Sequence, residues 1–339
     1  MAKTIISAKY PPLIDPTRAT LAFGRKALPV LKRDLESPVL LLKQRSMMSL
    51  SDYLHDPEHI AEALRQGFID LLLSLMHDSD SVIRHKCAEC FYLFANHSIG
   101  RQALVENHSI PYLVYLLDDE KDIVRLTVYK AIEMLSKTLA GIAILEANLV
   151  KLLLNKMLLE PDEMKYYILD TLHFCFKINV QEGLDNQGMN IFNDYLHNHD
   201  QEIRWRGARN IADLCQVLEG KNQAIEIMCV YPLIGMLSES NENIKVNATY
   251  ALMMIAITTK GKYTVLEAQA IPPLIRLLQD KSSQVRVNSL KTITCLAESP
   301  EGRQVLLDHV PQIKELQCDA LPSISRAATI AINKILWKP

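Results

Sequence analysis

The sequence predicts an all-α protein built from a repeated group of short helices. Hydrophobic residues make up 49% of the 339 residues, whereas aromatic residues (6%) and glycines (11) are scarce, and this composition favours helices. The stretch Ala270–Leu296 shows two amphipathic helices separated by a polar turn. The same pattern recurs along the rest of the chain, which makes a repeat architecture the simplest prediction.

The stretch Ala270–Leu296 defines the repeating unit. Pro272 and Pro273 suit the first turn of a helix, where the missing N–H would have no partner. In the second helix, Val285, Ser289 and Ile293 follow one another at steps of four residues and therefore lie on one face. Neither helix can bury its apolar stripe alone, so each needs a neighbouring unit.

The repeat is counted from the apolar residue that opens each long helix. These marker residues are Leu42, Ile83, Val124, Met164, Ile203, Ile244, Val285 and Ile324. By subtraction, successive markers are 41, 41, 40, 39, 41, 41 and 39 residues apart. A period of about 40 residues with two or three helices per unit is the armadillo/HEAT signature. We therefore predict an all-α, armadillo/HEAT-like, right-handed superhelical solenoid of about eight repeats.

Residues 1–26 differ from the repeats that follow. Each residue before a proline is pushed towards an extended conformation, so we predict an extended, Pro-containing N-terminal arm followed by the solenoid over residues 27–339. A disordered tail is the alternative. Apolar residues among the prolines favour docking of this arm. The candidate docking residues are Tyr10, Leu13, Ile14 and Phe23.

The predicted repeats follow in order along the chain, with polar or Pro-containing turns. The eighth is degraded, as expected for a cap that shows one face to water. Repeat two runs from Gly67 to about Asn107, with a predicted loop at Gly100 and Arg101. The other repeats begin near Ala27 (repeat one), at Ile110 (three), near Leu149 (four), near Met189 (five), at Tyr231 (six), at Ile271 (seven) and at Val310 (eight).

In seven repeats the residue directly after the marker is a cation, and these seven cations form a charge ladder. Its members are Lys43, Arg84, Arg125, Lys165, Arg204, Lys245 and Arg286. One interpretation is a basic groove for an acidic or extended peptide. The other is an internal brace, because an acidic residue or Asn often stands six positions before the cation. That residue could cap the long helix and pair with the cation of the next unit. We favour the brace, since structure requires such regularity and binding does not.

Non-periodic residues are better candidates for a partner-binding groove. Trp and Arg are frequent interface anchors, and Asn side chains can hydrogen-bond a ligand backbone. A solvated helix face is the alternative interpretation for each. The candidates are the non-periodic Trp205, Arg206, Arg209 and Asn210, together with Asn247 and Asn288, which align three residues after their markers.

Composition and motifs exclude several functions. A net charge of −2 gives no reason to expect nucleic acid or an anionic membrane surface. The pair Cys87 and Cys90 lies within a predicted helix and lacks the second pair that a zinc site needs. An odd number of cysteines predicts reduced thiols in the cytosol. We predict no catalytic centre, metal, cofactor or small-molecule substrate.

Two N-terminal stretches resemble a known family. Residues 11–18 read PPLIDPTR and residues 22–29 read AFGRKALP, with His55-Asp56-Pro57-Glu58 further on. This region resembles the radial spoke head 14 family. The resemblance implies a non-enzymatic component of the radial spokes of motile cilia and flagella, which binds other spoke and axonemal proteins. It implies localisation to the cytoplasm, the cytoskeleton and the axoneme, and it carries no catalytic residues.

The alternative function is a cytoplasmic armadillo adaptor for linear peptide cargo or signalling partners. Nuclear import adaptors carry a regular ladder of Trp and Asn. This chain has two tryptophans and no W-x-x-x-N motif. The absent ladder argues against an import receptor and favours the scaffold.

Overall fold

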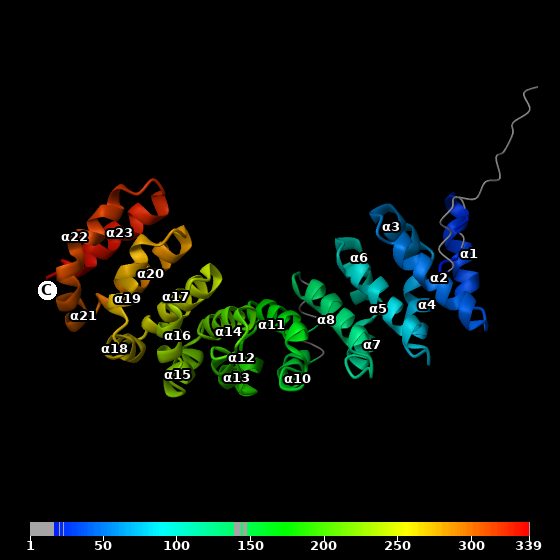
Figure 1. The fold of residues 1–339 in the computed structure, drawn as a ribbon, viewed down its shortest axis with the longest axis horizontal. Coiled ribbons are helices and arrows are strands. Elements are labelled where there is room, and N and C mark those ends of the chain that lie inside the picture. The colour runs from blue at the N-terminus through cyan, green and yellow to red at the C-terminus, as the bar shows by residue number, and fades with distance from the viewer. Residues whose placement is uncertain (1–16, 20, 23, 139–143, 145–147, 339) are drawn as a thin grey trace, which may run out of the picture. The chain divides into compact units, whose positions relative to one another are not determined.

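The computed structural model describes residues 17–19, 21–22, 24–138, 144 and 148–338. The described residues form helices and turns without any strand. The chain divides into two compact units, Met1–Ala143 and Ile144–Pro339, which are described separately below (Figure 1).

The described residues of the first unit form one helical pair followed by two sets of three helices. After a 3₁₀ turn at Gly24–Lys26 come α1 (Ala27–Leu35) and α2 (Leu40–Tyr53); then α3 (Pro57–Arg65), α4 (Phe68–Leu75) and α5 (Ser81–Ala95); then α6 (Ser98–Glu106), α7 (Ile110–Leu116) and α8 (Asp122–Ser136). The long helices stack in order, α2 on α5 and α5 on α8.

The second unit continues the same arrangement. Its helices are α10 (Leu149–Lys156), α11 (Asp162–Phe176), α12 (Gln181–Asp185), α13 (Gly188–Tyr195), α14 (Gln201–Leu214), α15 (Leu218–Glu226), α16 (Val230–Met236), α17 (Glu242–Ala256), α18 (Thr259–Glu267), α19 (Ile271–Arg276), α20 (Ser283–Leu296), α21 (Pro300–Leu306), α22 (Val310–Glu315) and α23 (Pro322–Ile335). The long helices α11, α14, α17, α20 and α23 stack in that order.

The predicted register is the register of the structure. Each marker residue is the third residue of its long helix, and every marker from Ile83 onward is buried. Burial follows from the helical period, since residues four apart face the neighbouring helices together. Each unit is therefore a solenoid of helical repeats, which confirms the predicted fold class.

A left-handed backbone residue joins the first and second helices of most repeats. Gly67 has φ of +69° and Met228 has φ of +61°. Only glycine adopts this region without steric cost, yet most of these positions carry a side chain. The non-glycine members are His108, Asn148, Gln187, Met228 and Gln269. The turn geometry is thus a property of the repeat and overrides local residue preference.

In several repeats, a glycine marks the place where a short helix closely approaches the long helix before it. The sequence predicts a loop at Gly100, and the structure corrects this, because Gly100 is the third residue of α6. A Cβ there would lie 2.1 Å from the carbonyl oxygen of Phe94. Gly261 occupies the same place in α18, where a Cβ would lie 2.0 Å from the carbonyl oxygen of Ile255. Glycine at this position allows contact rather than a break in the helix.

The described part of the N-terminal arm lies along α2. The backbone N–H of Ala19 donates to the carbonyl oxygen of Arg45 (3.2 Å), and Ser49 Oγ donates to the Ala19 carbonyl (3.0 Å). Arg18 forms an ion pair with Asp52 at 2.8 Å. Tyr10, Leu13, Ile14 and Phe23 lie outside the described residues, so their docking role and the boundary at residue 26 stay predictions.

Candidate protein-interaction surface

Five ladder cations form ion pairs with the turn of the following repeat. They join Lys43 to Asp78 (2.9 Å), Arg84 to Asp119 (2.5 Å), Arg204 to Glu239 (2.5 Å), Lys245 to Asp280, and Arg286 to Asp319 (3.2 Å). The predicted direction of pairing was wrong. Each acid was expected to pair with the cation of the next repeat, whereas in the structure it pairs with the cation of the preceding repeat. The long helix carries its cation towards the next turn in the stack, which places the two charges together.

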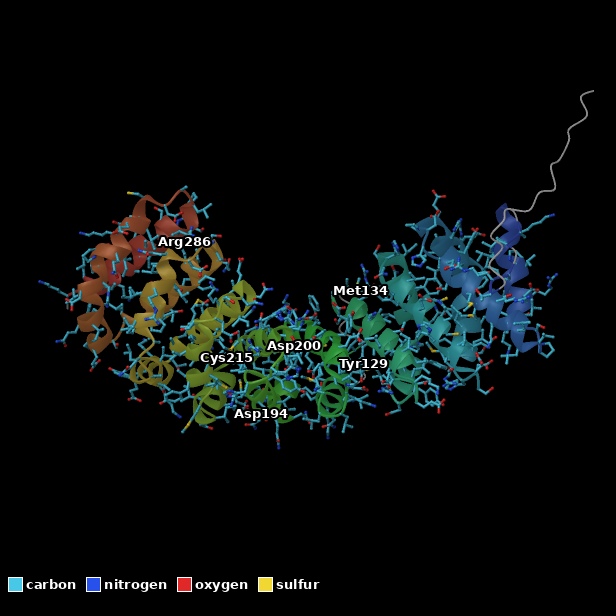
Figure 2. The ribbon with its side chains drawn as sticks, in the orientation of Figure 1. Tyr129, Met134, Asp194, Asp200, Cys215 and Arg286 are labelled. Carbon is cyan, nitrogen blue, oxygen red and sulfur yellow. The ribbon has the colours of Figure 1, made fainter. Side chains whose placement is uncertain are left out.

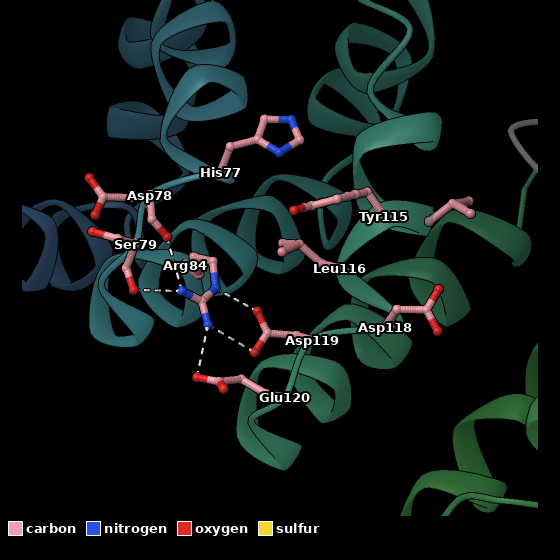
Figure 3. Close-up of a pocket in the computed structure, with 10 residues that line it drawn as sticks. His77, Asp78, Ser79, Arg84, Tyr115, Leu116, Asp118, Asp119 and Glu120 are labelled. Atoms are coloured by element: carbon pink, nitrogen blue, oxygen red, sulfur yellow. Dashed lines mark hydrogen bonds and ion pairs between the residues drawn. The ribbon is translucent and has the colours of Figure 1, made fainter.

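Arg84 shows how one guanidinium joins two turns (Figure 3). Nε and one terminal nitrogen donate to the carboxylate of Asp119, at 2.5 and 3.2 Å. The other terminal nitrogen donates to the backbone carbonyls of Asp78 (2.9 Å) and Ser79 (3.0 Å) in its own repeat. Arg204 repeats this arrangement in the second unit. Arg286 (Figure 2) donates to the carbonyls of its own turn and reaches Asp319 through one terminal nitrogen, at 3.2 Å. Each such arginine braces its own turn and the next one.

The acidic partner shapes the turn but does not cap the long helix as predicted. Asp119 accepts the backbone N–H of Lys121 at 2.9 Å, two residues on, and Asp78 does the same for Asp80. The side-chain cap of α5 is Asp80 itself, which accepts from the first helical N–H groups. An Asx turn therefore precedes the cap, because the carboxylate reaches two residues ahead.

Their environment keeps these carboxylates charged. Burial alone would raise the pKa of Asp119, but the hydrogen bonds from Arg84 and from the Lys121 backbone hold that pKa below its usual range. The pKa of Asp280 is lowered in the same way, against burial, by Lys245 and the Ser282 backbone. The lowered pKa values keep Asp119 and Asp280 ionised at neutral pH.

Two ladder cations pair within their own helices. Arg125 lies 3.0 Å from Asp122, and Lys165 lies 2.8 Å from Asp162. The residue six positions before Lys165 is Leu159, which replaces the usual acid and is 82% exposed. Whether the charge ladder also holds a ligand stays a prediction.

The arginines beside Trp205 are neutralised within the protein. The Arg206 guanidinium lies 4.1 Å from the Trp205 ring centroid and 3.0 Å from Asp170, which belongs to the preceding long helix. Arg209 reaches the same carboxylate at 2.5 Å, and Glu202 accepts from both Arg206 and Trp205. This cluster is a stacked, charge-balanced contact between α11 and α14, so its surface offers a partner little unpaired charge.

Two predicted groove residues are buried, which corrects their assignment to the surface. Asn210 is fully buried, and its amide donates to the carbonyls of Leu169 (3.1 Å) and Arg206 (2.9 Å). Asn288 is 2% exposed and donates to the carbonyl of Val246 at 3.1 Å. Both amides bridge neighbouring long helices. Asn247 remains on the surface and donates to Asn243 in its own helix (2.8 Å).

Among the described residues, the candidates for reactive thiols and metal ligands do not form a catalytic or metal site. Cys87 and Cys90 are fully buried, and burial raises the pKa of both thiols, which keeps them protonated. Figure 2 labels Cys215, which is likewise buried in the second unit. Within the described ranges, His, Cys, Asp and Glu form no group of three or more that could hold a metal ion. None of the helices described is both long and apolar enough to cross a membrane.

The long helices α17, α20 and α23 enclose a groove that sequence reasoning missed. It holds about 460 Å³, and its walls include Met253, Ile257, Val287 and Ile330. Ile257 and Ile330 are each about half exposed, at 50% and 52%. The sequence carries a signal for the charge of this groove but not for its shape, because neither α20 nor α23 contains an acidic residue.

Comparison with known proteins finds a family match for one stretch of the chain and shows the fold of the chain. Residues 258–297 match the armadillo/β-catenin-like repeat family. The chain is similar to a crystal structure of an engineered protein, with a TM-score of 0.86 and 19% identity over 93% of this chain and 79% of that one. A designed armadillo repeat protein matches with a TM-score of 0.48 and 20% identity, over 78% of this chain and 98% of that one.

A curated relative also matches part of the chain. Radial spoke protein 14 of Chlamydomonas reinhardtii is 24% identical over 123 residues, which is 36% of this chain. The match spans about a third (32%) of that relative's own length. The chain is therefore a solenoid of helical repeats with a distant similarity to a radial spoke protein.

Proposed function

We propose that this chain is a non-enzymatic scaffold of the radial spokes in the axoneme of motile cilia and flagella. The observation that carries the proposal is the similarity to Radial spoke protein 14 of Chlamydomonas reinhardtii. The N-terminal residues 11–18 and 22–29 support it independently, because they resemble the radial spoke head 14 family. The partners are other spoke and axonemal proteins, and no nucleic acid, membrane or small-molecule substrate is required.

The structure supports a scaffold in two ways. Inter-repeat ion pairs such as Arg84 with Asp119 tie successive turns together, so each unit presents a firm surface. Most ladder cations and the arginines beside Trp205 are already paired within the protein. The charges of the ladder and of the Trp205 cluster are therefore taken up inside the solenoid, which favours partner docking at other surfaces of the repeats.

Fractionation of motile cilia tests the proposal. Cilia are stripped with detergent and the axonemes are then extracted with a chaotropic salt, with immunoblots for this chain, a radial spoke protein and tubulin. The proposal predicts that the chain stays with the axoneme and is released together with the spoke protein while tubulin remains. Release by detergent alone, or absence from cilia, would contradict it and favour the cytoplasmic adaptor.

A further inference from the structure

The strongest unassigned feature is the groove between α17, α20 and α23, called here the C-terminal groove. Its walls carry Met253, Ile257, Val287 and Ile330, with Lys291 and Arg326 beside them. Both cations are exposed. Apolar walls with a small number of charged groups are typical of a site that binds a side chain and fixes its orientation.

The two cations of the C-terminal groove are unpaired. Within the part of the chain that the structure describes, neither Lys291 nor Arg326 forms a hydrogen bond or an ion pair through its side chain. The cluster at α11 and α14 differs, because Asp170 there accepts from both Arg206 and Arg209. An exposed cation without a partner is free to meet a carboxylate from another molecule.

The acids that flank α20 and α23 in the sequence are already engaged. Asp319 pairs with Arg286, and Glu298, just after α20, lies 2.7 Å from Lys262 and 3.8 Å from Lys334. Because α20 and α23 contain no acidic residue of their own, the positive charge of Lys291 and Arg326 is not balanced along these helices. Charge complementarity therefore calls for an acidic occupant.

We propose that the C-terminal groove binds a segment of a partner protein in which carboxylates stand beside apolar side chains. The apolar side chains pack against Ile257, Val287 and Ile330, while the carboxylates meet Lys291 and Arg326. The inference rests on the proposed scaffold function and specifies where and by what chemistry one partner docks. It is tested with peptides, independently of the location of the chain in cilia.

Three short synthetic peptides serve as probes. In the first, Leu and Phe alternate with Glu; in the second, Gln replaces every Glu; in the third, Lys replaces every Glu. Binding of each labelled peptide to the full chain is measured by fluorescence anisotropy at low and high salt. The acidic peptide is expected to bind most tightly and to lose affinity with salt, because exposed ion pairs are screened.

Variants locate the binding. The double variant Lys291→Gln, Arg326→Gln should weaken binding of the acidic peptide about tenfold, as expected for the loss of two exposed charge pairs. Ile330→Ser should weaken the acidic and Gln peptides alike. Lys314→Gln on α22 is the matched control, since Lys314 is exposed and does not line the groove. Circular dichroism checks that each variant is folded.

Two cysteines give a readout of position. Cys295 lines the C-terminal groove, whereas Cys318 is exposed and lies outside it. The alkylation of each cysteine by N-ethylmaleimide is measured by mass spectrometry. A saturating concentration of the acidic peptide should slow alkylation of Cys295 and leave the alkylation rate of Cys318 unchanged. Equal binding of the Gln peptide, no binding of the acidic peptide, or unprotected Cys295 would overturn the inference. The axonemal proposal could still hold in that case, because the fractionation result does not depend on this groove.

Discussion

Arg84 of one repeat holds Asp119 of the next, with the guanidinium Nε 2.5 Å from the carboxylate. Both side chains are largely shielded, at 12% and 3% exposure, and Arg84 also donates to carbonyls of its own turn. The same arrangement recurs at Arg204 with Glu239, and Arg286 reaches Asp319 through one terminal nitrogen. A charged residue at a repeated position therefore stabilises the stacking of repeats within each unit.

Breaking this pair should destabilise the first unit. Arg84→Gln leaves the shielded carboxylate of Asp119 without its partner, and such losses cost about 3 kcal/mol. Thermal unfolding followed by circular dichroism measures the effect. Lys121→Gln is the control, because Lys121 is exposed and lies 3.8 Å from Glu120. Its free energy of unfolding should differ from that of the wild type by no more than about 0.5 kcal/mol. Equal melting of both variants would contradict a bracing role for Arg84.

The contribution of Asp119 should depend on pH. Its pKa in the folded protein is lowered from the ordinary value of 3.8, so its stabilising effect is full above about pH 4 and is lost as pH falls through the lowered pKa. The stability difference between the wild type and Asp119→Asn should be constant from neutral pH down to that range and shrink below it. A difference independent of pH would show that the charge of Asp119 contributes nothing.

Two glycines in helices should respond in opposite ways to alanine. A Cβ on Gly261 would meet the Ile255 carbonyl at 2.0 Å, so Gly261→Ala must push α18 away from α17 and should cost about 3 kcal/mol. A Cβ on Gly235 in α16 has no atom within 4 Å. Gly235→Ala should therefore be neutral or stabilise by about 0.5–1 kcal/mol. Similar melting temperatures for the two variants would refute the close approach at Gly261.

The left-handed residue Met228 offers a stabilising substitution. Its side chain is 64% exposed, so little packing is lost on truncation, while its φ of +61° is costly for any residue with a Cβ. Met228→Gly should raise stability by about 0.5–1 kcal/mol. Met228→Ala keeps the Cβ and should not. The measurement is thermal unfolding of both variants, and a gain for alanine equal to that for glycine would count against backbone strain.

The helical register could be predicted from the sequence because it depends on a local period. Each marker, from Ile83 to Ile324, combines an apolar residue with a fixed place in the long helix, and both features are visible in the sequence. The cations of the ladder share this register. Their partners are harder to see, since each acid lies about 35 residues further on, and the predicted pairing direction was wrong.

The candidate groove could not be derived in the same way. Trp205, Arg206 and Arg209 resemble interface anchors, but Asp170 of the preceding repeat neutralises the arginines. Asn210 and Asn288 are polar residues that bridge helices in the interior. Such roles depend on contacts about 40 residues apart in the sequence. The C-terminal groove likewise depends on apolar side chains of three repeats lying together, although the lack of acids in α20 and α23 is visible in the sequence.

Cross-linking in intact axonemes tests the central claim most directly. A carbodiimide joins an amine to a carboxylate without a spacer, so it reports a lysine in direct contact with an acid. The account predicts that Lys291 becomes joined to an Asp or Glu of another axonemal protein, and that exposed Lys314 does not. Absence of the chain from axonemes, or partner cross-links at Lys314 with none at Lys291, would contradict the account.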